Sequence, residues 1–71
     1  MEIIITSTKT LTTIDGVPVR VWKGTTQGGI DCYVFVHRLA VRRDQDCGEF
    51  DRELREQLPP EEHVPLAEVL Q

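Results

Sequence analysis

The chain has 71 residues, a formal net charge of −4 and two cysteines. A chain of this length forms one small domain that buries only about 60% of its unfolded surface, so we expect oligomerisation to supply part of its stability. Two cysteines are too few for a disulfide framework, and the apolar run in MEIIITSTK is too short for a signal peptide or a membrane span. We therefore expect a location in a reducing cytoplasm and no association with membranes.

Charge is distributed unevenly along the chain. Residues 1–43 contain six Lys and Arg against three Asp and Glu, whereas residues 44–71 contain two Arg against nine Asp and Glu. This pattern predicts a dipolar molecule with a basic N-terminal half and an acidic C-terminal half. Such halves attract each other between copies, or present one sign of charge to a partner.

The N-terminal part of the chain predicts two strands joined by a tight turn. Residues 2–14 are rich in Ile and Thr and show no helical period, and residues 17–23 alternate valine with other side chains. The Asp-Gly dipeptide between these runs is typical of a two-residue hairpin turn. This turn predicts antiparallel pairing with Ile14 opposite Val17.

A glycine-rich stretch at 24–29 separates the second strand from a third strand predicted at 30–41. If the turn closes symmetrically, Val21 lies opposite Cys32 and the aliphatic side chains of both strands share one face. The opposite face, here called the aromatic face, then carries Arg20, Trp22, Tyr33, Phe35 and His37. Because exposed apolar patches usually mark a binding site, these five residues are the candidate binding surface.

A helix is predicted at 47–58. Asp46 followed by Glu49 resembles a capping pair, and the Pro-Pro dipeptide that begins at Pro59 ends the helix. One apolar stripe recurs at three- and four-residue steps. Its members are Cys47, Phe50, Leu54 and Leu58. We expect this stripe to pack on the aliphatic face of the sheet.

The C-terminal part is predicted to be a polar linker at 61–63 followed by a docked segment at 64–70. The segment fits a short helix with Pro65 in its first turn, which we favour, or an extended edge strand. The whole chain, residues 1–71, is thus predicted to be a single α+β domain. It comprises a three-stranded antiparallel meander, one helix packed on one face and a short C-terminal segment.

The residues that could perform catalysis or bind metal are not spaced for either task. Cys32 and His37 lie five positions apart on one strand and point to opposite faces, and no C-x-x-C or H-x-x-x-H pair is present. Cys47 fits the apolar stripe better than it fits a reactive thiol. The glycine-rich stretch leads into a strand, whereas phosphate loops lead into a helix. We expect no enzymatic activity, no metal and no cofactor.

Two hypotheses assign a function to the aromatic face. We favour a protein-interaction module that forms a homodimer through this face, because small cores need the extra burial. The alternative is a platform for single-stranded nucleic acid, on which the rings stack bases and arginines meet phosphates. The net negative charge and the lack of an RNP-type motif weigh against it. The face could also be the bed of the C-terminal segment.

A third hypothesis concerns the acidic half of the chain. The carboxylates around the predicted helix would form a surface that inhibits a nucleic-acid-binding protein. Its residues are Asp44, Asp46, Glu49, Asp51, Glu53 and Glu56.

Three runs of the sequence resemble small proteins of bacteriophages and of their prophage or plasmid remnants. These runs are VRVWKGTTQGGIDCYVFVHRLAV, DCGEFDRELREQLPP and VPLAEVL. The resemblance implies a cytoplasmic protein of a bacterial host that is not an enzyme. It also implies a host protein as partner, since many such proteins inhibit a host protein, some through acidic surfaces that imitate DNA. It assigns no functional residue.

Overall fold

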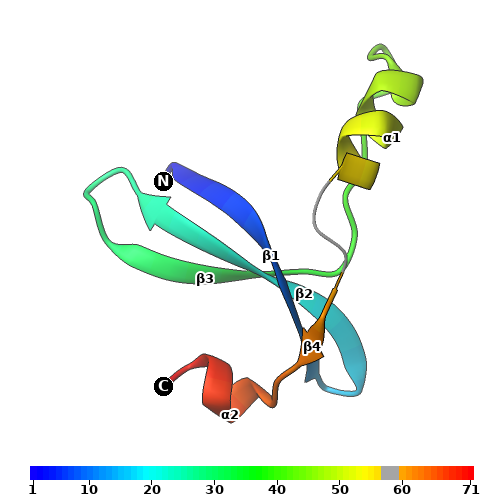
Figure 1. The fold of residues 1–71 in the computed structure, drawn as a ribbon. Coiled ribbons are helices and arrows are strands. Elements are labelled where there is room, and N and C mark those ends of the chain that lie inside the picture. Colours follow the sequence, from blue (N-terminus) through cyan, green and yellow to red (C-terminus); the bar gives the residue numbers. More distant parts are fainter. Residues whose placement is uncertain (57–59) are drawn as a thin grey trace.

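A four-stranded sheet with the strand order β3-β2-β1-β4 is the centre of the molecule (Figure 1). The computed structural model describes residues 1–56 and 60–71, apart from the side chain of Glu56. The predicted α+β class and the antiparallel meander β1-β2-β3 are confirmed, although a fourth, parallel strand makes the sheet mixed. The elements are β1 (Ile3–Ile14), β2 (Val17–Thr26), β3 (Asp31–Val36), α1 (Cys47–Glu56), β4 (Glu62–His63) and α2 (Leu66–Val69).

The hairpin between β1 and β2 has the predicted turn and register. Asp15 and Gly16 adopt positive φ angles of 51° and 79°, as the two central residues of a type I′ turn must. Ile14 pairs with Val17, as predicted. The Asp-Gly dipeptide therefore sets the register at this end of the sheet.

A bulge interrupts β1 at Thr8, Lys9 and Thr10, which together lie opposite Val21 of β2. The Thr8 hydroxyl donates to the Val21 carbonyl, and Arg20 Nη1 donates to the Thr8 carbonyl at 3.0 Å. These side-chain bonds replace ladder bonds that the bulge removes. Because bulges bend a strand and increase its twist, the second half of β1 takes a different direction from the first.

The prediction of a polar linker at 61–63 is wrong, because part of this segment forms the edge strand β4. Glu62 and His63 pair in parallel with Thr10 and Leu11 of β1. The Thr10 hydroxyl also donates to Glu62 Oε1 at 3.0 Å, across a separation of 52 residues. A two-residue strand that pairs over such a distance leaves no local periodicity in the sequence.

One row of paired residues crosses all four strands. Val36 of β3 lies opposite Arg20, Arg20 lies opposite Leu11, and Leu11 pairs with His63 of β4. β3 ends in this row, and β4 ends in it as well. The segment between β3 and β4, which includes α1, therefore leaves one edge of the sheet and returns at the other.

The predicted register between β2 and β3 is wrong. Val21 lies opposite Phe35, not opposite Cys32, and Cys32 lies opposite Gly24. Gly24 is a strand residue, and the turn that joins the strands occupies only residues 27–30. The shorter loop shifts the pairing by three positions, and an odd shift moves every β3 side chain to the other face relative to β2.

The hydrophobic core lies between the sheet and α2. Thr12, Val19 and Val21 share one face of β1 and β2, and they are buried together with Val69 of α2. Figure 1 shows α2 lying against this side of the sheet. The C-terminal segment is thus helical in part, the alternative that we favoured, and it supplies the cover.

The start of α1 is capped as predicted. The backbone N–H of Glu49 donates to Asp46 Oδ1 at 3.0 Å, and the N–H of Phe50 donates to the Asp46 carbonyl at 3.0 Å. The predicted end of the helix at residue 58, the stripe member Leu58 and the stop at Pro59 lie outside the described residues. None of the described helices is long and apolar enough to cross a bilayer.

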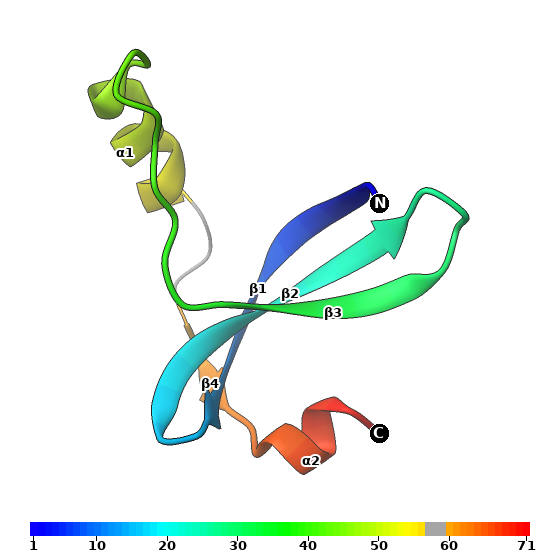
Figure 2. The same ribbon diagram turned by 180° about the vertical axis from the view of Figure 1, so that it is seen from behind.

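The prediction that this helix packs on the aliphatic face is wrong. Figure 2 shows α1 projecting away from the sheet on the side remote from α2, and it packs broadly against none of the described strands. Its half-buried Phe50 and Leu54, together with the exposed Glu53, approach the sheet near Trp22. Four residues of α2 therefore supply the cover that we expected from α1.

Candidate interaction surface

The predicted aromatic face does not exist as one surface. Because the β2–β3 register is shifted, Arg20 and Trp22 lie on one face of the sheet, whereas Tyr33 and Phe35 lie on the other. His37 follows the end of β3, is exposed, and places Nδ1 3.4 Å from the Pro18 carbonyl oxygen. The five candidate residues are therefore divided among two faces and a loop.

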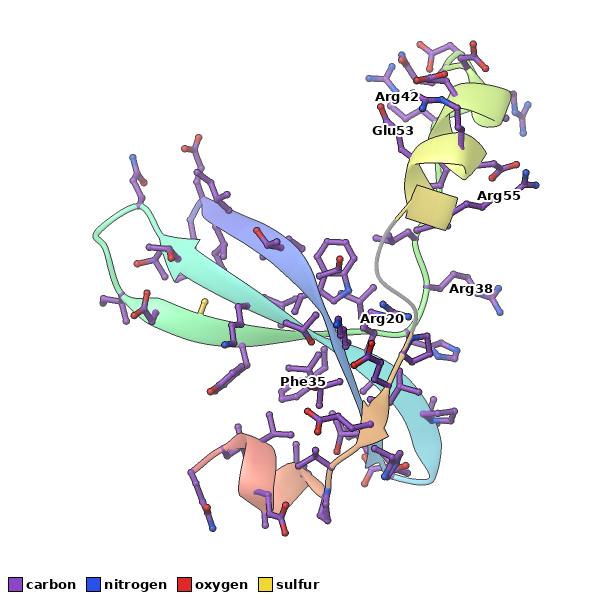
Figure 3. All side chains as sticks on the ribbon, viewed as in Figure 1. Arg20, Phe35, Arg38, Arg42, Glu53 and Arg55 are labelled. Atoms are coloured by element: carbon purple, nitrogen blue, oxygen red, sulfur yellow. The ribbon has the colours of Figure 1, made fainter. Side chains whose placement is uncertain are left out.

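The two aromatic rings of β3 have different surroundings. Figure 3 shows Phe35 directed from β3 toward α2, where it is half-buried beside the core. Tyr33, two residues earlier on the same face, is 42% exposed. Phe35 thus belongs to the core, and Tyr33 borders an open hollow with Lys23 and Asp31.

The opposite side of the sheet carries an apolar surface that we call the Trp22 face. The register places its side chains on neighbouring positions of β1, β2 and β3. Its members are Ile3, Ile5, Trp22, Cys32 and Val34. All are half-buried by their neighbours within the sheet except Ile3, which is 38% exposed, and no described helix covers them as α2 covers the core.

Gly24 makes the Trp22 face continuous. A Cβ atom at this position would lie 2.9 Å from Ile3 Cγ2, 3.1 Å from Ile5 Cγ2 and 3.1 Å from Cys32 Sγ. The absence of a side chain lets these three neighbours close over the β2 backbone, which buries Gly24. The close approach of the isoleucines and the cysteine explains why glycine occupies the middle of a strand.

α1 forms a wall at one end of the Trp22 face. A mostly apolar hollow of about 260 Å³ lies between the helix and the sheet. Its lining consists of Ser7, Trp22, Leu39, Phe50, Glu53 and Leu54. Phe50 and Leu54, two members of the apolar stripe, therefore face the same space as the indole ring without filling it.

The molecule exposes more surface than its mass predicts. Its accessible surface is 5708 Å², whereas a folded monomeric protein of 8.1 kDa exposes about 4,500 Å². Its radius of gyration is 13.5 Å, against about 11 Å for a compact chain of this length. The excess of roughly 1,200 Å² arises from an extended sheet with one uncovered face and a projecting helix.

Three of the predicted acidic residues already have partners. Asp44 Oδ2 accepts from Arg42 Nη2 at 3.1 Å, Asp46 caps α1, and Glu49 Oε2 accepts from Arg52 Nε at 3.1 Å. The hydrogen bond from Arg52 lowers the pKa of the Glu49 carboxyl, against a smaller opposing effect of desolvation.

The remaining acidic residues lie on or beside α1. Asp51 and Glu53 are exposed, and Figure 3 shows Glu53 at the end of the molecule remote from α2. The side chain of Glu56 lies outside the described residues. The acidic surface is therefore carried by a helix that stands apart from the sheet.

Neither cysteine is part of a site with further ligands. Cys32 and Cys47 are both free, and among residues 1–55 and 60–71 no three His, Cys, Asp or Glu side chains converge to hold a metal ion.

Sequence reasoning missed Ile3 and Ile5 as surface-forming residues. Their contribution becomes visible only once the register places them beside Gly24 and Cys32. No protein-family model, curated protein or solved structure matches this chain. The resemblance to phage-encoded proteins therefore stays a prediction.

Proposed function

We propose that this chain is a non-enzymatic protein-interaction module that self-associates as a homodimer. The observation that supports this proposal is the excess of roughly 1,200 Å² of exposed surface over that of a monomer of the same mass. Stable interfaces of standard size bury about 800 Å² per partner, so the excess is large enough for one. Association would supply the apolar burial that a small core with few buried side chains lacks.

Sedimentation velocity at increasing micromolar concentrations tests this proposal directly. We expect the sedimenting mass to approach twice the 8.1 kDa of the chain as the concentration rises. A mass of one chain at every concentration would contradict self-association. Apolar interfaces are insensitive to salt, so the dimer should persist at high ionic strength.

The nucleic-acid hypothesis receives less support than dimerisation. A stacking platform needs its rings on one surface, and the register separates Trp22 from Tyr33 and Phe35. Arg20, the cation beside Trp22, donates to the Thr8 carbonyl and so helps to hold the bulge. Titration of Trp22 fluorescence with single-stranded oligonucleotides should therefore give no salt-dependent quenching.

A second candidate function is inhibition of a nucleic-acid-binding protein by α1 and the loop before it. The observation that favours it is the projection of this acidic helix away from the sheet. Residues 44–56 contain six carboxylates against two arginines. If these carboxylates imitate phosphates, the protein should displace DNA from a basic DNA-binding protein in competition experiments. Replacing Asp51 and Glu53 by Asn and Gln should weaken that displacement, whereas dimer formation should not change.

A further inference from the structure

We propose that two copies of the chain join through their β3 strands, which pair antiparallel across a two-fold axis and continue the sheet from one copy into the other. This inference rests on the proposed self-association and adds the surface that performs it. The seam consists of backbone hydrogen bonds, with the aromatic rings of β3 packed across it.

β3 is an edge strand whose outer side is open. It pairs with β2 on one side, and among residues 1–56 and 60–71 no backbone hydrogen bond reaches its other side. The Thr26 N–H donates to the Ile30 carbonyl at 2.9 Å, which fixes the alternation of the ladder, so every second residue from Cys32 onward bonds to β2. The remaining β3 residues direct their backbone N–H and C=O groups outward, without a backbone partner in the described chain. They are Asp31, Tyr33 and Phe35.

β3 lacks the features that protect exposed edges. Natural edge strands are shielded by prolines, lysines, bulges or a covering segment, because unpaired backbone groups recruit other strands. β3 has the sequence DCYVFV, pairs with β2 without a bulge, and carries Asp31 as its only charged side chain. Of the described elements, only β2 packs broadly against it. The outer side of β3 can therefore receive a further strand.

The other outer edge of the sheet is less available. The second half of β1 is occupied by the segment around β4, and the Glu61 N–H donates to the Lys9 carbonyl at 2.9 Å. The first half of β1 leads to Ser7, which lines the hollow beneath α1. The open part of β1 is thus short, whereas β3 is open along its whole length (Figure 1).

The charges at the two ends of β3 favour a second copy as the occupant. The strand begins at the exposed, acidic Asp31, and the basic Arg38 follows its end, exposed and directed away from the sheet (Figure 3). Antiparallel pairing brings the acidic start of one strand beside the basic end of the other, and a two-fold axis does so twice. Each edge also offers equal numbers of N–H and C=O groups, so two copies satisfy each other.

A two-fold axis at Val34 gives the register of the seam. Outward-pointing residues face each other in such a ladder, so Tyr33 of each copy pairs with Phe35 of the other. Both rings lie on the α2 side of the sheet, where Tyr33 is 42% exposed, and aromatic cross-strand pairs stabilise a ladder. Asp31 then lies beside the segment that carries Arg38 of the second copy. An axis at Tyr33 would instead place Asp31 opposite Phe35.

Proline at an outward-pointing position tests the seam. Tyr33→Pro removes an N–H that β2 does not use, so the ladder within each copy stays intact. We expect it to raise the dimer dissociation constant by about 100-fold or more, because two seam hydrogen bonds are lost per dimer and the proline ring obstructs close approach. Tyr33→Val, the matched control, keeps the N–H and should raise the dissociation constant much less. The urea midpoints of both variants, measured below the dissociation constant, check that they keep the fold.

Cysteine cross-linking tests the register independently. In a background of Cys32→Ser and Cys47→Ser, Val34→Cys places two thiols at the axis in a non-hydrogen-bonded pair, whose Cα atoms are close enough for a disulfide. In a buffer of oxidised and reduced glutathione, this variant should form a covalent dimer at concentrations where the wild type dimerises. Val36→Cys is the control, because position 36 of one copy lies opposite position 32 of the other. Its cross-linking should be slower by about tenfold or more.

The outcomes separate the two proposals. A wild-type chain that sediments as a monomer at every concentration overturns both, and leaves the edge of β3 to an extended segment of another protein. A wild-type dimer that Tyr33→Pro weakens no more than Tyr33→Val overturns the seam alone. A wild-type dimer in which Val36→Cys cross-links as fast as Val34→Cys also overturns the seam and leaves self-association intact. If Tyr33→Pro does not fold, the cross-linking pair alone decides.

Discussion

The two faces of the same sheet have similar apolar residues and different surroundings. On one face, Thr12, Val19 and Val21 are closed off by α2. On the other, Ile5 and Val34 remain half-buried, with no helix above them among the described residues. The comparison shows that alternation along a strand distributes apolar side chains to both faces, whereas the short α2 covers only part of one face, on which Ile4 stays 81% exposed.

The position of β4 decides which face is covered. Its pairing with Thr10 and Leu11 fixes the chain at the edge of β1, only three residues before α2 begins. Because this tether is so short, α2 reaches only the neighbouring part of the sheet. The other helix, α1, lies in a long segment whose described residues form no such pairing with the sheet.

The largest effect is expected from a charge in the covered face. Val21→Asp places a carboxylate at a position that is 3% exposed, and burying an unpaired charge costs several kcal/mol. Because a core of this size supplies only about 3–5 kcal/mol, we expect the variant to be unfolded, as measured by circular dichroism and urea titration. Ile4→Asp, on the same side of the sheet and exposed, is the control and should fold. A folded Val21→Asp variant would show that the α2 side is not the core.

A smaller effect is expected at the centre of the Trp22 face. Gly24→Ala places a methyl group 2.9 Å from Ile3 Cγ2 and 3.1 Å from Cys32 Sγ, so these side chains must move. Overpacking of this kind costs about 1–3 kcal/mol in the free energy of unfolding.

Gly28→Ala is the control for Gly24→Ala. Gly28 lies in the β2–β3 turn, where the nearest atom to an added Cβ is 4.0 Å away. We expect its urea midpoint to match that of the wild type. If Gly24→Ala is as stable as the wild type, then the side chains around Gly24 are less tightly packed than these distances indicate.

One substitution in the covered face is expected to raise the free energy of unfolding instead of lowering it. Thr12 is fully buried, and its hydroxyl oxygen has no hydrogen-bond partner among the described residues. Thr12→Val removes this unsatisfied group while keeping the branched shape, so we expect the free energy of unfolding to rise by about 1 kcal/mol. Thr13→Val is the contrast, because the Thr13 hydroxyl lies 2.9 Å from His63 Nε2 and the substitution breaks that bond. Equal effects of the two changes in urea titration would contradict the conclusion that the Thr12 hydroxyl is unsatisfied and the Thr13 hydroxyl is hydrogen-bonded.

The smallest effect belongs to α1, outside both faces. The Arg52 hydrogen bond lowers the pKa of Glu49, so the stability it gives is present above the unfolded pKa of Glu49 and is lost as pH falls through the folded pKa. Arg52→Gln should therefore raise the pKa of Glu49, measured by NMR titration of its carboxyl carbon. Arg55→Gln removes an equal charge from the same helix and should raise it less. Because Glu49 lies on the surface, global stability should barely change.

The two hairpins differ in whether their strand register could be predicted from the sequence. The first turn was predicted correctly because Asp15 and Gly16 are residue types that accept positive φ, and the type I′ turn leaves one register. At the second turn, Gly24 was interpreted as part of the loop although it is a strand residue under close neighbours. The strand position of Gly24 depends on contacts with Ile3 and Cys32, and these distant neighbours cannot be identified from the local sequence pattern.

The predicted binding surface was wrong for the same reason, because it depended on the β2–β3 register. The odd register shift separated Trp22 from Tyr33 and Phe35 and brought Trp22 into line with Val34. The cap of α1 at Asp46 could be predicted because it depends on residues three positions apart. β4 and the cover by α2 could not, since both depend on pairing between segments more than 50 residues apart.

The row that joins Val36, Arg20, Leu11 and His63 has a consequence for how this protein can change. Three interstrand steps separate its ends, about 14 Å, a gap that four or five extended residues would bridge. The 25 residues between Val36 and Glu62 are far more than that closure requires. Most of this segment, α1 included, is therefore free to vary in sequence and length while the strands keep their partners. Substitutions in α1 and its flanking loops can thus change what this segment contacts without changing the pairing of the four strands.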